Sequence, residues 1–509
     1  RSEQKGRTRL VFEQSALAAL QAPEPLLPPD VPQWPHVAFS TGASWTVLAR
    51  SYHQAVEAQL KDVDLTAQAR EAVGTETRRE AVALRLLAWV HEQVRYTVLQ
   101  LGEASVIPRS PYETLLRKYG DCKDMATLLV ALLRASGIPA HVALVRVGPE
   151  EVQEALPGFG LFDHAIVYLP GQPALWVDAT DAFNPPGSLT GLVQGRLALV
   201  AAPDTKGLLR LPEAPASANG FTATRDFFLA EEGPAKLVER KSFTGTQAAL
   251  YREHFTRSNP DRVREGYAEY AKTAFSAPDI GRLEPSGLTA LDTPFVVELE
   301  LPAASRGYTD EREAVVGLWP LSLFSHLPEA LTAERKEGTP ARRHELLLPD
   351  AYASELRYRV VPPPGFSPAP LPAPFSVKLG PASYTGSYSQ QGKEVLATFR
   401  LETGKRRYSA AEVEAFREAV AQLDAKSEPL VLRFRRDGAE HLAAGRITEA
   451  LREFRRLVAL HPQEALHRSH LALALVEAGA GDEARAEARR AVDAEPKSAT
   501  AWRALALVL

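Results

Sequence analysis

The chain's one cysteine, Cys122, is the residue whose type could most directly do chemistry. It lies in the sequence Gly-Asp-Cys-Lys-Asp at residues 120–124, where a loop gives way to an apolar helical pattern that extends to Ser136. A lone thiol cannot form a disulfide within the chain. At a helix start, free N–H groups and the helix dipole stabilise a thiolate, whereas the two neighbouring aspartates act against it. We therefore predict a nucleophilic thiol that needs a helper base.

A histidine and an aspartate that could assist this thiol follow on two predicted strands. His164 opens one β-rich run, and Asp178 lies in the next run, after a turn at Gly171. A hairpin folded about Gly171 would make His164 and Asp178 cross-strand neighbours with Cβ atoms about 5 Å apart. A register slip of one residue would instead put them on opposite faces. The sequence predicts Cys122 as nucleophile, His164 as base and Asp178 as the carboxylate that orients the imidazole.

These residues and their neighbours also have structural interpretations. A single cysteine is most often a small buried hydrophobic residue, but the charged residues on either side of Cys122 argue against deep burial. We expect structural or solvated positions for the other polar residues nearby: His91 on a helix surface, His141 in a strand, and Asp163 and Asp181 in solvent.

The N-terminal segment, 1–42, is rich in proline and predicts a strand remnant at 9–12 followed by an extended linker. The chain begins at Arg1, in what reads as the middle of a domain. We expect that an upstream segment, with an export signal, precedes it.

Residues 43–210, here called the Cys122 domain, combine helical and strand patterns. Helical periodicity marks 44–60 and 77–94, a third helix follows Cys122, and β-rich runs at 140–147, 164–169 and 175–179 predict strands. Helices followed by an antiparallel sheet predict an α+β domain.

Residues 211–405, here called the middle domain, alternate between apolar and polar side chains in runs separated by Gly, Pro and Asn. This pattern predicts a sandwich-like β domain with one helical insert at about 248–274. A connecting helix at 406–430 begins with a capping box formed by Ser409 and Glu412.

Residues 431–509, here called the repeats, show a period of about 34 residues, the length of a tetratricopeptide unit. Pro462 and Pro496 are one such period apart, as are Gly445 and Gly479. This period, with small residues where helices must pack closely, predicts two full tetratricopeptide repeats and an incomplete third, and we expect the protein to continue. Arginines gather on one predicted face, which is either a solvated surface or a groove for an acidic peptide: Arg452, Arg455, Arg456, Arg485, Arg489 and Arg490.

Composition excludes some classes of function. The 59 basic and 63 acidic residues give a formal net charge of −4, which offers no support for a nucleic-acid partner. The sequence has no apolar run of about 18 residues or more, so we predict no membrane-spanning helix.

The motifs together resemble the transglutaminase-like superfamily of papain-like cysteine enzymes. The resemblance rests on residues 119–124 around Cys122, on Gly137-Ile-Pro139, on Asp163-His164 and on Trp176-Val-Asp178-Ala-Thr180, and it covers about residues 45–200. In this superfamily the nucleophile, the base and the orienting carboxylate follow one another along the chain, so the resemblance implies the same roles for Cys122, His164 and Asp178. It also implies a bacterial, exported protein in which the segment 1–42 is the tail of an N-terminal β domain. The sequence has no calcium-site pattern, and we predict no cofactor and no metal.

Two functions remain open at this point. The first is thiol-dependent acyl transfer on a protein or peptide amide, with Cys122 forming a thioester that water or an amine resolves; we favour water, hence a protease or amidase. The oxyanion hole would use the Cys122 N–H and a second donor from the loop 98–105. The alternative is a non-catalytic scaffold or adaptor that binds a partner protein through its repeats.

Overall fold

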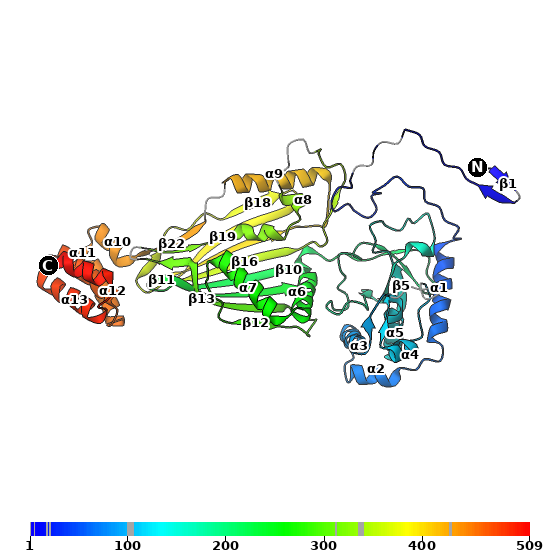
Figure 1. Cartoon of the computed structure of the whole chain (residues 1–509), viewed down its shortest axis with the longest axis horizontal. Helices are drawn as coiled ribbons and strands as arrows, with labels where there is room; N and C mark the ends of the chain where they lie inside the picture. The colour runs from blue at the N-terminus through cyan, green and yellow to red at the C-terminus, as the bar shows by residue number, and fades with distance from the viewer. Residues whose placement is uncertain are drawn as a thin grey trace.

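The computed structural model describes residues 2–4, 6–16, 19, 22–98, 106–310, 313–333, 340–426 and 430–509. The chain is elongated, with the Cys122 domain near one end, the middle domain at the centre and the repeats at the other end (Figure 1). The α+β multidomain fold class predicted from the sequence is confirmed. At the N-terminus, β1 (Ser2–Gln4) pairs with β2 (Arg7–Arg9), so the strand predicted at 9–12 is misplaced.

The Cys122 domain packs helices against one face of a five-stranded sheet of order β7-β6-β5-β8-β9. Its helices are α1 (Trp45–Leu60), α2 (Thr66–Val73), α3 (Arg79–Gln93), α4 (Pro111–Arg117) and α5 (Cys122–Ala135). Its strands are β5 (His141–Val145), β6 (His164–Leu169), β7 (Leu175–Val177), β8 (Leu197–Val200) and β9 (Leu209–Arg210), with a separate parallel pair of β3 (Arg95–Tyr96) and β4 (Tyr119–Gly120). The patterns at 44–60 and 77–94 correspond to α1 and α3, whereas α2 and α4 escaped prediction because they span only 8 and 7 residues.

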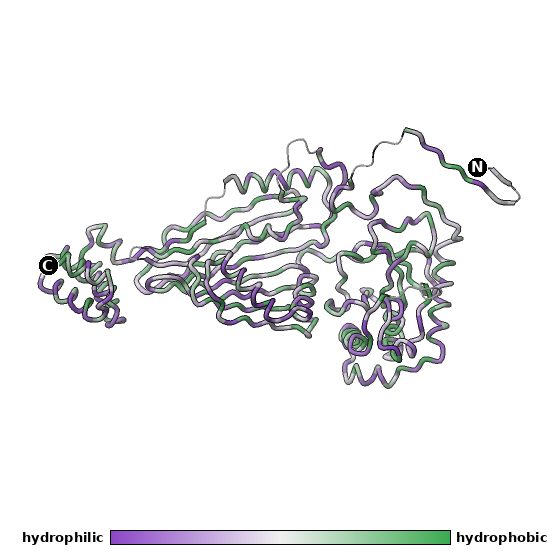
Figure 2. The backbone as a smooth tube through the Cα atoms, in the orientation of Figure 1, coloured by the Kyte–Doolittle hydropathy of each residue, from purple (hydrophilic) through white to green (hydrophobic). Residues whose placement is uncertain are grey.

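Helix α5 is the centre of this domain. Its side chains are buried on nearly every side, and the apolar character continues along its length (Figure 2). The helix ends where Gly137 takes a left-handed φ of 77° and the Ile138 N–H donates to the Leu133 carbonyl. That bond satisfies a terminal carbonyl, and Pro139 then prevents the helix from continuing.

The hairpin of β6 and β7 forms with a register different from the predicted one. Val167 pairs with Val177 and Leu169 with Leu175, a shift of two residues from the pairing expected for His164 and Asp178. A shift of two preserves the face on which each side chain lies, because side chains alternate with a period of two. His164 and Asp178 therefore stay on one face despite the wrong register.

The middle domain contains one curled sheet of 11 strands, in the order β17-β22-β14-β13-β11-β10-β16-β20-β19-β18, with β12 paired to β13. Its strands are β10 (Gly220–Phe228), β11 (Gly233–Thr244), β12 (Leu283–Ser286), β13 (Phe295–Thr309), β14 (Glu313–Gly317), β16 (Ala353–Val361), β17 (Phe366–Pro368), β18 (Phe375–Leu379), β19 (Ala382–Gln391), β20 (Glu394–Glu402) and β22 (Val431–Arg436). Neighbours are antiparallel except β10 and β16. The β-rich character agrees with the sequence, but the strands of the expected sandwich belong to one hydrogen-bonded sheet.

Helices pack on the sheet of the middle domain (Figure 1). The predicted insert forms α6 (Gly245–Arg257) and α7 (Pro260–Phe275), and the connecting helix forms α9 (Ala410–Lys426). The capping box of α9 is present, since the Ser409 N–H donates to Glu412 Oε2 at 2.7 Å and the Glu412 N–H donates to Ser409 Oγ at 3.3 Å. Smaller elements complete the domain: η3 (Ala216–Ala218), η4 (Pro320–His326), α8 (Glu329–Thr332) and the pair of β15 (Leu346–Leu347) with β21 (Arg407–Tyr408).

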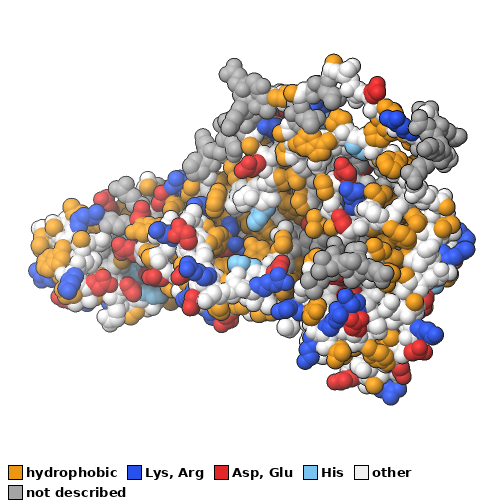
Figure 3. Space-filling model, turned by 45° about the vertical axis from the view of Figure 1, so that its right-hand side comes forward, with side chains coloured by type: hydrophobic (Ala, Val, Ile, Leu, Met, Phe, Trp, Pro, Cys, Tyr) orange, Lys and Arg blue, Asp and Glu red, His pale blue; other side chains and the backbone are white. Residues whose placement is uncertain are grey.

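The repeats form α10 (Asp437–Ala443), α11 (Ile447–Leu460), α12 (Ala465–Glu477), α13 (Gly481–Ala494) and α14 (Ala499–Val508). Gly445 and Gly479 both have left-handed φ values, 71° and 74°, directly after a helix of each repeat. Strand β22, which lies in the range assigned to the repeats from the sequence, belongs to the middle sheet. Basic and acidic side chains alternate over the repeats (Figure 3), and four arginines of the predicted basic face, Arg455, Arg456, Arg485 and Arg490, pair with Glu or Asp.

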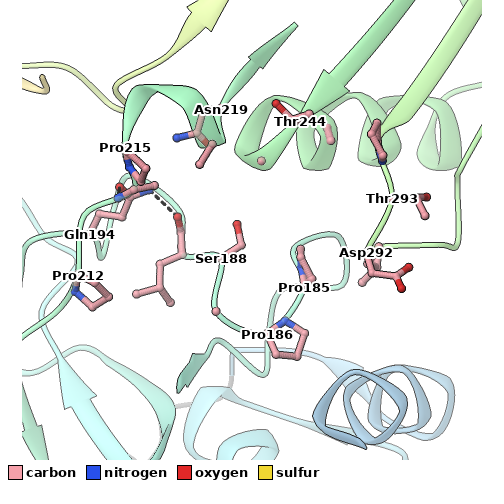
Figure 4. Close-up of a pocket in the computed structure, with 18 of the residues that line it drawn as sticks. Pro185, Pro186, Ser188, Gln194, Pro212, Pro215, Asn219, Thr244, Asp292 and Thr293 are labelled. Atoms are coloured by element: carbon pink, nitrogen blue, oxygen red, sulfur yellow. Dashed lines mark hydrogen bonds between the residues drawn. The ribbon is translucent and has the colours of Figure 1, made fainter. Parts of the chain in front are cut away.

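The buried guanidinium of Arg406, the residue just after the range assigned to the middle domain, joins that domain to the Cys122 domain. It donates to the carbonyls of Gln194 at 3.1 Å and Gly191 at 3.0 Å, and it pairs with Glu213 at 3.0 Å. Only 2% of Arg406 is exposed. Beside this joint, a cavity of about 650 Å³ separates loops of the two domains, with Gln194 and Ser188 on one side and Thr244 and Asp292 on the other (Figure 4).

Replacing Arg406 with Met should lower the melting temperature by roughly 5–10 °C, because buried carbonyls and Glu213 would lose a charged donor. Arg400→Met is the matched control, since Arg400 is half-exposed and its ion pairs with Glu355 and Glu402 lie at the surface. Scanning calorimetry of both variants checks this prediction. Equal melting temperatures for the two variants would contradict a role for Arg406 at the joint.

Candidate functional site

Cys122 is the first residue of α5, and 6% of it is exposed. Asp121 caps the helix, because its Oδ1 accepts the N–H groups of Lys123 at 3.2 Å and Asp124 at 3.3 Å. Asp124 completes the capping box by accepting the Asp121 N–H at 3.3 Å. The sulfur is therefore held at the positive end of a well-capped, buried helix, where a thiolate is stabilised.

The charged residues around Cys122 are buried, contrary to the expectation from the sequence. Asp121, Lys123 and Asp124 are 3%, 4% and 6% exposed. They satisfy one another instead of reaching solvent: Lys123 forms an ion pair with Asp121, and Asp124 also accepts the Arg109 N–H at 2.8 Å. Burial raises the pKa of Asp124. The charged neighbours of Cys122 therefore wrongly predicted an exposed cysteine. They are buried because an ion pair and backbone hydrogen bonds compensate them.

His164 and Asp178 are hydrogen bonded, as the sequence predicted. His164 Nε2 lies 2.8 Å from Asp178 Oδ2, and each side chain is 11% exposed. Thr180 holds the carboxylate from the other side, since its N–H and Oγ1 donate to Asp178 Oδ1 at 2.9 and 2.7 Å. The sequence reasoning missed the role of Thr180, although an Asp followed two residues later by Thr is a known local hydrogen-bonding pattern.

The two side chains are an ion pair. Burial alone lowers the pKa of His164, but the charge and hydrogen bond of Asp178, together with the interaction with Cys122, raise it to about 10. Burial also works against the Asp178 carboxylate, but His164 and Thr180 lower the pKa of that group overall. Because Nε2 is engaged by Asp178, the Nδ1 atom is the one left for the thiol of Cys122.

The pKa values of two tyrosines, Tyr52 and Tyr96, are raised by burial and by the charge of Cys122. Tyr96 lies on β3, which pairs with the residues immediately before Cys122, and the Thr97 N–H donates to the Gly120 carbonyl at 2.9 Å. Burial and the charges of Cys122 and Asp178 raise the pKa of Tyr96 to about 12. Tyr52 is buried and donates to the Val106 carbonyl at 3.1 Å. Sequence reasoning gave no signal for either tyrosine, because both approach the site through tertiary packing.

His91 is not the surface residue that the sequence suggested. It is half-buried, and its Nε2 is shielded from solvent with no hydrogen-bond partner among the described residues. Burial lowers the pKa of His91, although Asp181 and Asp178 partly oppose this effect. His91 is therefore close enough to Asp181 and Asp178 for their charges to affect it. Asp181, also expected in solvent, is half-buried and accepts the Phe183 N–H at 2.9 Å.

A cleft of about 560 Å³ lies next to Thr180, which holds Asp178, but Cys122, His164 and Asp178 are not among its described lining residues. Its lining includes His91, Tyr96, Thr180 and Ala182 of the Cys122 domain. Arg257, at the end of α6 in the middle domain, closes one side, and its guanidinium lies 5.5 Å from the Phe183 ring centroid. The middle domain thus contributes a wall of the cleft.

Of the expected oxyanion-hole donors, only the Cys122 N–H can be placed. It is at the first position of α5, where helix geometry provides no acceptor for it. The second donor was expected from the loop 98–105, of which 99–105 lie outside the described residues. Within the described ranges, no group of three or more His, Cys, Asp or Glu side chains could hold a metal ion, and no helix has the length and apolar character needed to cross a membrane.

Comparisons with known proteins find two families in the chain. Residues 66–179 match the transglutaminase-like superfamily, and residues 441–508 match a tetratricopeptide repeat. The chain therefore contains a transglutaminase-like domain and C-terminal tetratricopeptide repeats. No curated protein matches the sequence.

Among solved structures, the chain is similar to the crystal structure of a candidate protease from Parabacteroides distasonis. The two sequences are 12% identical, and the TM-score is 0.47. The similar region covers 80% of this chain and spans 64% of the length of that chain.

The ionised state of His164 can be tested by titration. Since its folded pKa is raised from 6.5 to about 10, the stabilisation from protonated His164 is fully present below pH 6.5 and is lost as the pH rises through about 10. We expect the ring to remain protonated from about pH 6 to 8 in the intact protein and to become neutral in this range in Asp178→Asn. NMR chemical shifts of the ring nitrogens report this directly. Asp181→Asn is the control, and equal titration in all three proteins would contradict the ion pair.

Proposed function

We propose that the chain is a thiol-dependent acyl transferase that acts on amide bonds, with Cys122 as nucleophile, His164 as base and Asp178 as the orienting carboxylate. The single observation that carries the proposal is the 2.8 Å contact between His164 Nε2 and Asp178 Oδ2, formed beside a thiol at the start of a helix. The transglutaminase-like domain at 66–179 includes all three residues and supports the same chemistry.

The geometry supports a two-step reaction. The Cys122 sulfur attacks the amide carbonyl carbon, its proton resides on His164, and the carbonyl oxygen accepts the Cys122 N–H. His164 then gives that proton to the leaving amine as the C–N bond breaks, which leaves a thioester on the sulfur. Water attacks the thioester, His164 takes its proton, and the acid product leaves with the thiol restored. Asp178 keeps the imidazole in place throughout, and Thr180 keeps Asp178 in place.

We favour water over an amine as the second reactant. The cleft of about 560 Å³ is lined mainly by polar side chains, including Glu92, Gln93 and Arg95, and Tyr96 is 41% exposed. We propose that the substrate reaches Cys122 through this cleft, whose polar lining does not exclude water, whereas amine transfer requires water to be kept from the thioester. The cleft also contains Arg95, Lys118 and Arg257 against one carboxylate, Glu92, which favours a peptide substrate with an acidic residue near the amide.

A second candidate function is protein binding by the repeats. The match of residues 441–508 to a tetratricopeptide repeat supports this candidate, because such repeats commonly bind partner proteins. The arginines that pair with neighbouring acids leave little free charge for an acidic partner at those positions. Binding by the repeats and hydrolysis by the Cys122 domain are compatible, because the repeats could hold the substrate protein.

The catalytic assignment is tested by turnover of labelled casein, with and without dansylcadaverine as an acceptor amine. Cys122→Ala should abolish turnover, and His164→Ala should reduce it about 10²–10⁴-fold because the proton then has no carrier. His141→Ala is the control, since His141 is half-buried on the same sheet but is not part of the proposed site. Peptide release without dansyl incorporation is the expected product pattern. Full turnover by Cys122→Ala would refute the assignment.

The role of the repeats is tested by a chain that ends at Arg436, which keeps β22 in the middle sheet. We expect this truncation to hydrolyse short peptides at the full rate and to capture fewer proteins in a pull-down, because the packed helices that follow are then absent. The full chain with Cys122→Ala serves as the comparison, so that captured substrates are not consumed. Identical captured proteins from both chains would show that the repeats recruit nothing.

A further inference from the structure

The middle domain contains a cavity of about 300 Å³ that is separate from the site around Cys122. All of its lining residues belong to the middle domain, and they come from β10, β11, β16, α6, α7 and the segment around η4. The volume is at the lower end of the range for small-molecule sites, which is roughly 300–1,000 Å³. A small ligand could therefore fill it.

Aromatic rings form the walls of this cavity. Phe243 and Tyr251 stack with ring centroids 3.8 Å apart and an interplanar angle of 23°. Phe221 and Tyr270 add further walls, and Trp319 is 40% exposed at the open side. Flat aromatic walls of this kind favour a flat apolar ring as the occupant.

The base of the cavity carries more positive than negative charge. Arg225 forms a buried ion pair with Glu239 at 2.8 Å, and Lys241 Nζ lies 3.5 Å from the other oxygen of the same carboxylate. Arg306 lies nearby, with its guanidinium 5.5 Å from the Trp319 ring centroid. Two cations thus share one carboxylate beside a third cation, and the described lining residues include Arg225 and Lys241 but no acid. Uncompensated charge in a poorly hydrated cavity is costly, so an anion would be stabilised there.

Lys241 is the cation whose ammonium group can bind an anion in the cavity. Each of the three nitrogens of Arg225 already donates one hydrogen bond, to Glu239, Tyr358 and Tyr270 at 2.8, 2.5 and 3.3 Å. Lys241 has three N–H groups, of which one faces Glu239 and another the Tyr270 ring, whose centroid is 3.9 Å from Nζ. The third N–H is available to an acceptor in the cavity.

Polar groups surround the open side. The Ser322 hydroxyl donates to the Trp319 carbonyl at 2.7 Å, and the Ser325 hydroxyl donates to the Ser322 carbonyl at 2.8 Å. His326 contacts the edge of the Phe221 ring, with centroids 5.0 Å apart. An apolar interior, a cation at the base and a polar entrance are the usual parts of a small-molecule site.

We propose that this cavity binds a small organic acid with a flat apolar ring, whose carboxylate contacts Lys241 and whose ring lies among Phe243, Tyr251 and Trp319. The proposal is independent of the chemistry at Cys122, because the two sites share no lining residue.

The test is a ¹⁹F NMR titration of the full chain with 4-fluorophenylacetate and with its neutral analogue, 4-fluorophenylacetamide. The acid should bind at least about tenfold more tightly than the amide, because a charge-assisted hydrogen bond to Lys241 is available only to the acid. Lys241→Met should remove this difference. Lys236→Met, the matched control on the same strand, should keep it, since Lys236 is half-exposed and paired with Glu300 at 2.6 Å.

A second variant covers the case in which Lys241→Met does not fold. Ser322→Trp places a large side chain at the open side and leaves the buried charges intact, so it should abolish binding of the acid without lowering the melting temperature of the chain. Equal affinity for the acid and the amide, undiminished binding by Ser322→Trp, or no detectable binding of the acid would each overturn the proposal.

Discussion

The ion pair between His164 and Asp178 is the interaction on which the proposed chemistry depends. Removing an imidazolium from water is unfavourable, and a carboxylate at 2.8 Å reverses that effect. The carboxylate is itself buried and is fixed by two donors from Thr180. Helix α5 carries Cys122 at its first residue, and the proposed chemistry requires the thiol to meet the other side of the ring. In that proposal, the sheet, the central helix and the turn after β7 hold three side chains together.

The same constraint explains why so much charge is buried at the start of α5. Asp121 and Asp124 cap the helix, Lys123 pairs with Asp121, and the Arg109 N–H satisfies Asp124. Lys123 and Asp121 therefore compensate each other's charge, backbone N–H groups hold Asp124, and the Cys122 N–H has no acceptor within the helix. This cluster fixes the position of the thiol, which a mobile loop could not do.

Local patterns in the sequence predicted most of the Cys122 domain, whereas contacts between distant segments escaped them. Periodicity located α1, α3 and α5, because an apolar stripe is a property of the helix itself. The hairpin register was wrong by two residues, yet His164 and Asp178 still met, because side-chain direction depends only on whether the shift is even. The entry of β22 into the middle sheet and the approach of Tyr96 to the thiol depend on tertiary packing, and no local pattern encodes them.

The rate of alkylation of Cys122 by iodoacetamide, measured against free cysteine from about pH 6 to 9, tests the central claim most directly. A thiolate held beside a protonated imidazole should react faster than free cysteine at the acidic end of this range, and Asp178→Asn should remove the advantage. A wild-type rate that never exceeds that of free cysteine would contradict the account, because the thiol would then receive no help from His164.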